Sequence, residues 1–93
     1  MIVLCITAQL HLAWCRSLKE KRAQAQSLTS RLRQRFNVSV AQSGSQDKHQ
    51  LLTLSLAALA FDAAQADSIA QNLYDFVLGN SQGELLVWEV EHR

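Results

Sequence analysis

Apolar and polar residues alternate along four stretches of the chain, at residues 1–12, 37–42, 50–60 and 84–91. A period of two is the pattern of a strand with one well-buried face. In the third stretch Leu52, Leu54 and Leu56 share one face, and smaller residues occupy the other. The pattern predicts four strands, but it leaves open which face of the last one is buried: Leu86, Trp88 and Val90, or Leu85, Val87 and Glu89.

Two intervening segments have helical spacing instead. Ser17 followed by Glu20 is a capping-box pair, and Asp62 followed by Gln65 repeats that pattern at the start of a second helix. Gly79 is the predicted C′ residue that ends the second helix. Each helix carries an apolar stripe with members three and four positions apart. The stripes are Leu18, Ala25, Leu28, Leu32 and Phe36 in the first helix, and Ala66, Ile69, Ala70, Leu73, Phe76 and Val77 in the second.

The predicted order is therefore strand, helix, strand, strand, helix, strand. Each strand–helix–strand unit crosses over right-handedly, so both helices cover the same apolar face of the sheet. This predicts one α+β domain over residues 1–93, a ferredoxin-like βαββαβ sandwich. Its four-stranded antiparallel sheet has the order 4-1-3-2, with two helices on one face.

Composition narrows the class of protein further. The 93 residues are 48% hydrophobic and 18% charged, with no proline, which argues against disorder. The apolar runs are much shorter than the ~20 residues that span a bilayer, and residues 1–10 lack the features of a secretory signal. We therefore expect a cytoplasmic protein without a membrane partner. Cys5 and Cys15 match no zinc pattern, and we interpret them as two reduced thiols, one packed and one partly exposed.

Positive charge is concentrated in the first helix and the residues that lead into it. Residues 16–35 hold seven basic residues and one acidic residue, whereas the rest of the chain holds two basic and seven acidic ones. Such a helix can bind phosphates as point charges without recognising a base sequence. The alternatives are an ordinary solvated surface, or contact with the acidic surface of another protomer. The candidate nucleic-acid-binding residues are Arg16, Lys19, Lys21, Arg22, Arg31, Arg33 and Arg35.

Lys21 differs from these neighbours because its spacing places it within the leucine stripe. We expect its side chain to pass the stripe and reach water.

The sheet face without helices is predicted to be small, mildly apolar and nearly free of charge. An RNA-recognition domain of this topology stacks bases on aromatic residues of the central strands, and none is present at those positions. Small neutral side chains instead favour packing against a second copy, although a solvated face is the alternative. The predicted homodimer interface consists of Cys5, Thr7, Ser39, Thr53, Ser55 and Ala57.

Further polar residues gather in the predicted loops. His11, Asp47 and His49 are expected at one end of the sheet, beside the start of the first helix, where a bound anion is favoured over a divalent metal. With Asn37 they form the predicted loop and hairpin contacts. The chain has no phosphate-binding loop, nucleophile elbow or placeable cysteine–histidine pair, so we expect a non-enzyme without a metal or cofactor.

The segments RSLKEKR (residues 16–22), RFNVSVA (residues 35–41) and the following Gln46–Asp47 resemble the YlxP-like family of small bacterial proteins. The preceding strand, which ends in His11–Leu12, also fits this family. The resemblance implies a ferredoxin-like fold and self-association. Because the family's genes tend to lie among those for transcription and translation factors, it also implies a link to RNA or the ribosome. The matching positions to watch are Lys19, Lys21, Arg22, Arg35, Asn37 and Asp47.

Two functional hypotheses result. The first is a homodimeric protein associated with RNA or the ribosome, which binds phosphates through its first helix. The second is a homodimeric regulatory module that binds a small molecule at the sheet or dimer interface.

Overall fold

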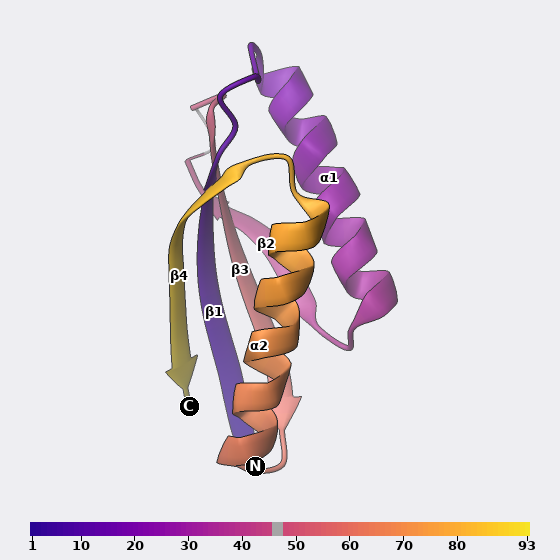
Figure 1. Cartoon of the computed structure of the whole chain (residues 1–93), viewed down its shortest axis with the longest axis vertical. Coiled ribbons are helices and arrows are strands. Elements are labelled where there is room, and N and C mark those ends of the chain that lie inside the picture. Colours follow the sequence, from indigo (N-terminus) through magenta and orange to yellow (C-terminus); the bar gives the residue numbers. More distant parts are fainter. Residues whose placement is uncertain (46–47) are drawn as a thin grey trace.

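The computed structural model describes residues 1–45 and 48–93, and it confirms the predicted order of elements. Figure 1 shows both helices on one side of the sheet. The elements are β1 (Ile2–His11), α1 (Leu18–Arg35), β2 (Ser39–Gly44), β3 (Leu51–Ala60), α2 (Ala63–Asn80) and β4 (Glu84–His92).

The sheet is antiparallel throughout and has the strand order β2-β3-β1-β4. This is the predicted order 4-1-3-2 counted from the opposite edge. The two central strands pair over their full lengths, from Ile2 opposite Ala60 to His11 opposite Leu51. The α+β, ferredoxin-like fold predicted from the sequence is therefore confirmed.

The core lies between the sheet and the two helices. Ile6 and Leu54 are buried from the central strands, and Leu32 is buried from α1. The rings of Phe36 and Phe76 meet edge to face, with centroids 5.4 Å apart, and join the two helix stripes. Both cysteines are free; Cys15, in the loop before α1, is buried, and Cys5 of β1 is partly exposed. Neither helix of the described chain is long and apolar enough to cross a membrane.

The start of each helix follows the capping prediction, but the end of α2 does not. Ser17 Oγ accepts a hydrogen bond from Glu20 N at 3.1 Å, and Asp62 Oδ1 accepts one from Gln65 N at 2.8 Å. Gly79, the predicted C′ residue, lies inside α2. The prediction was wrong because Gly79 does not adopt a positive φ; the helix continues to Asn80, and Ser81 N donates to Val77 O at 3.0 Å.

A bulge decides which face of β4 is buried. Gln9 pairs with Val87 but Leu10 pairs with Leu85, so Leu86 is an extra residue in β4. The alternation changes phase there, and Leu85 and Trp88 both pack against the core although they are three residues apart.

Candidate functional site

Six basic side chains of α1 and the loop before it form a surface that we call the cationic ridge. All are exposed except Arg31, which is partly buried. None of the six makes an ion pair within the described part of the chain, where Arg93 pairs with Glu91, and His92 Nε2 lies 3.6 Å from Asp67 Oδ1. The ridge consists of Arg16, Lys19, Arg22, Arg31, Arg33 and Arg35.

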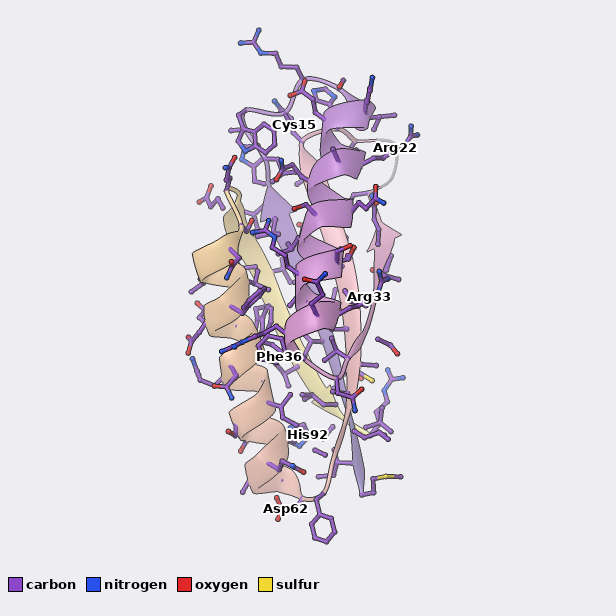
Figure 2. All side chains as sticks on the ribbon, turned by 90° about the vertical axis from the view of Figure 1, so that its right-hand side faces the viewer. Cys15, Arg22, Arg33, Phe36, Asp62 and His92 are labelled. Atoms are coloured by element: carbon purple, nitrogen blue, oxygen red, sulfur yellow. The ribbon has the colours of Figure 1, made fainter. Side chains whose placement is uncertain are left out.

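The ridge has a concave part beside β2. Arg22 and Arg33 line a hollow of about 320 Å³ together with Gln26 and Gln42, and Figure 2 labels both arginines along α1. Arg33 Nη2 donates to Val40 O at 2.7 Å, which fixes its guanidinium against β2. At a rise of ~1.5 Å per residue, the two arginines are separated by about 16 Å along the helix.

The other flank of α1 faces α2 and is less open. Arg31 Nη2 donates to Ser27 Oγ at 3.1 Å, so part of its guanidinium is used within the helix. Arg35 lines a second hollow beside Phe36 and the exposed Asp75 of α2. The β2 flank is therefore the part of the ridge best suited to an external anion.

Lys21 does not belong to the ridge. The sequence correctly places it in the buried stripe, but the expectation that it reaches water is wrong, since its exposed fraction is 0%. Its ammonium donates to Ser45 O, and to Lys48 O at 2.7 Å. A buried ammonium needs such oxygen partners, and here backbone carbonyls of the segment between β2 and β3 supply them. Lys21 thus joins the first turns of α1 to that segment.

The structure brings some of the predicted loop contacts together and separates another. His11 and His49 line one hollow of about 460 Å³ at the end of the sheet, with Lys48, Gln50 and Leu51. Asp47 lies outside the described residues. Asn37 follows the far end of α1 and therefore lies apart from these two histidines. Among residues 1–45 and 48–93, no three His, Cys, Asp or Glu side chains are placed to hold a metal ion.

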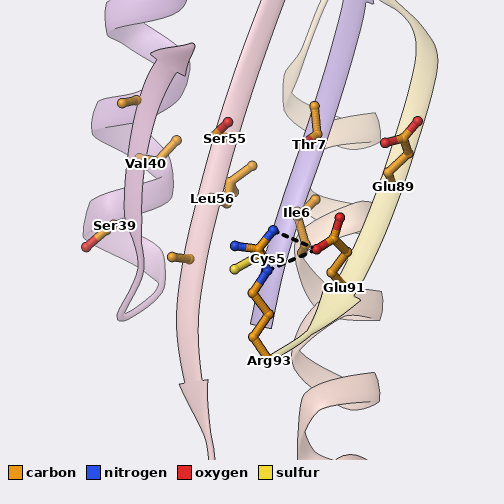
Figure 3. A pocket seen from close by; sticks show the side chains of 12 residues that line it. Cys5, Ile6, Thr7, Ser39, Val40, Ser55, Leu56, Glu89, Glu91 and Arg93 are labelled. Carbon is orange, nitrogen blue, oxygen red and sulfur yellow. Dashed lines mark hydrogen bonds and ion pairs between the residues drawn. The ribbon is translucent and has the colours of Figure 1, made fainter. Parts of the chain in front are cut away.

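The uncovered sheet face carries a hollow of about 430 Å³, shown in Figure 3. Of the six predicted interface residues, Thr53 does not line this hollow; its hydroxyl is hydrogen-bonded to Gln9 Nε2 and Ser45 Oγ, at 3.3 and 3.0 Å. The hollow is lined by the other five, Cys5, Thr7, Ser39, Ser55 and Ala57.

The prediction that this face is nearly free of charge is wrong. Glu89, Glu91 and Arg93 also line the hollow, because the phase change in β4 determines which of its residues share this face. Arg93 donates to Glu91 Oε2 from Nε and Nη2, at 3.0 and 2.8 Å. This hydrogen bonding, together with coulombic attraction to the same carboxylate, raises the pKa of Arg93.

Comparison with known proteins places the chain in a family. A family model described as "Protein of unknown function (DUF503)" matches residues 3–90. The "Uncharacterized protein YlxP" of Bacillus subtilis (strain 168) is 34% identical over 61 residues, which cover 66% of this chain and 66% of that protein. The chain belongs to the DUF503 family, and the resemblance to YlxP-like proteins seen in its sequence is confirmed.

Proposed function

We propose that this DUF503 protein is a non-enzymatic, cytoplasmic RNA-binding protein that holds phosphate groups on its cationic ridge, on free RNA or on ribosomal particles. The observation that carries this proposal is the absence, within the described residues, of any carboxylate paired with the ridge. Its positive charge is therefore available to an external polyanion.

The geometry of the β2 flank favours a phosphate backbone over a single small anion. Arg22 and Arg33 are about 16 Å apart along the helix axis at ~1.5 Å of rise per residue, which is further than a single phosphate group extends. Arg33 is already held by Val40 O, so less conformational entropy is lost when its remaining donors bind. Contacts of this kind position an RNA without recognising its sequence.

Charge reversal on the ridge tests this proposal. Arg22→Glu is expected to weaken RNA binding on the order of tenfold at low salt, and Lys19→Glu combined with Arg22→Glu to lower the slope of log affinity against log salt by about 2. Both side chains are exposed, so the fold is expected to persist.

Ala64→Glu combined with Ser68→Glu is the matched control, because the pair makes the same total change of charge at exposed positions near the start of α2. It is expected to leave RNA affinity within about twofold of the wild type. Equal losses in Arg22→Glu and in this double variant would show that only net charge matters, and would refute a site on α1.

We also propose that the protein forms a homodimer through its uncovered sheet face. The floor of the hollow consists of small side chains, which permit close approach of a second sheet.

The same hollow supports the alternative function, a regulatory module that binds a small ligand there. Glu89 and Glu91 favour a ligand that carries a positive charge. A ligand-induced rise in melting temperature, without RNA binding, would favour this alternative.

A further inference from the structure

The hollow at the end of the sheet, which we call the hairpin-end hollow, is lined by His11, Lys48, His49, Gln50 and Leu51. We propose that it binds one unstacked nucleobase of an RNA whose phosphates lie on the cationic ridge. This inference rests on the proposed RNA binding and adds the class of RNA: a strand or loop with unpaired nucleotides.

The lining of the hollow has the chemistry that a base requires. Bases stack on flat rings, including the imidazole of histidine, and His11 and His49 supply two such rings. Leu51 pairs with His11 across β1 and β3 and adds an aliphatic surface. The middle of the sheet has only small side chains at Cys5, Thr7, Ser55 and Ala57, so it cannot serve as a stacking platform.

The charges around the hollow favour one path for the backbone of the bound RNA. The exposed Lys48 lies on one side and can neutralise the phosphate next to the bound base. On the other side, His11 pairs with Glu84 across β1 and β4, and that carboxylate repels phosphate. The backbone of the strand is therefore expected to leave the hollow on the Lys48 side, away from β4.

The walls of the hollow are held in place from both sides. Gln50 Nε2 donates to Ala13 O at 3.2 Å, and Gln50 O accepts from Leu12 N at 2.8 Å, so Gln50 is tied to the connection between β1 and α1. Lys21 of α1 binds the carbonyl of Lys48 from the other side. A site fixed in this way loses little entropy when a base enters.

The hollow and the start of the ridge lie at the same end of the molecule. Lys21 of α1 donates to the carbonyl of Lys48, which lines the hollow, and Gln50 Nε2 donates to Ala13 O in the loop that leads to Arg16. We therefore expect an RNA on Arg16 and Lys19 to have the hairpin-end hollow within reach.

The test compares four RNA probes: a 12-nucleotide single strand of adenylate, its abasic ribose-phosphate counterpart, a 12-base-pair duplex and adenosine monophosphate. The wild-type protein is expected to bind the single strand on the order of tenfold more tightly than the abasic strand. His49→Ala should remove this preference and leave binding of the abasic strand unchanged. His49 is exposed, so folding is expected to survive the change.

Two further variants separate stacking from charge. His49→Phe should retain the preference for the strand with bases within about twofold, whereas His49→Lys should not. Restoration by lysine but not by phenylalanine would overturn the inference, because it would indicate a phosphate contact.

The outcomes also separate this inference from the proposed function. Equal binding of the single strand, the abasic strand and the duplex, unaffected by His49→Ala, would overturn the base site and leave RNA binding on α1 intact. No binding of any polymeric probe would overturn both. Adenosine monophosphate bound as tightly as the 12-nucleotide strand would identify a site for free nucleotides and would overturn the inference.

Discussion

At the scale of the single residue, Lys21 shows what the sequence could and could not predict. Helical spacing places Lys21 in a row of leucines and therefore correctly predicts its orientation. Two partners of its ammonium could not be predicted, because these backbone carbonyls lie 24 and 27 residues further along the chain. Only the fold determines which carbonyls reach that position. One of them belongs to Ser45, whose φ of 57° is uncommon for a residue with a side chain.

Replacing Lys21 should therefore destabilise the protein, even though no leucine of the core is changed. Lys21→Met keeps most of the aliphatic stem but removes the donors to Ser45 O and Lys48 O. We expect the free energy of unfolding to fall by about 2 kcal/mol, measured by denaturant titration. Lys19→Met, an exposed neighbour on the same helix, should change it by less than about 0.5 kcal/mol. Equal effects of the two substitutions would contradict the structural role of Lys21.

At the scale of the element, periodicity and capping residues predicted the strands and helices, because those signals are local. The bulge at Leu86 could not be predicted, since an extra residue in one strand is defined only by its partner's register. For the same reason, the sequence could not predict that glutamates of β4 line the hollow of the uncovered face. Local signals thus predicted the cationic ridge, whereas the composition of the uncovered face depended on pairing between strands.

Replacing two glycines near the ends of these elements by alanine should have opposite effects on the stability of the protein. A Cβ at Gly79 of α2 meets nothing within 4 Å, so Gly79→Ala should stabilise the protein by about 0.5–1 kcal/mol. A Cβ at Gly83, just before β4, would lie 2.6 Å from Leu12 Cδ2 and 3.1 Å from His11 O. Gly83→Ala should destabilise by about 1–3 kcal/mol through overpacking. Thermal or denaturant unfolding checks both, and a gain in stability from Gly83→Ala would show that this contact is not tight.

At the scale of the whole molecule, the largest group of positive charges and the glutamates of β4 lie on opposite sides of the sheet. The cationic ridge lies on the helix side, and Glu89 and Glu91 lie on the uncovered face. The net charge is only +1, but the positive and negative charges are unevenly distributed over the surface. This arrangement keeps Glu89 and Glu91 away from an RNA on α1.

Assembly through that face predicts a specific response to one large side chain. Ala57→Arg places a long cation on the floor of the hollow and should convert a dimer into a monomer of 10.4 kDa in sedimentation experiments. Ala64→Arg, on the exposed start of α2, is the matched control and should leave the dimer intact. A wild-type protein that sediments as a monomer at high concentration would exclude the dimer, and a dimer retained in Ala57→Arg would place its interface elsewhere.

The central claim is that external phosphates bind the cationic ridge, and nuclear magnetic resonance tests it most directly. A short RNA is added to isotope-labelled protein at low salt, and the shifts of backbone amides and arginine Nε groups are followed. We predict salt-sensitive changes at residues 16–35, strongest at Arg22 and Arg33, with β4 unchanged. Changes confined to Glu89, Glu91 and Arg93, with an unaffected α1, would contradict the account.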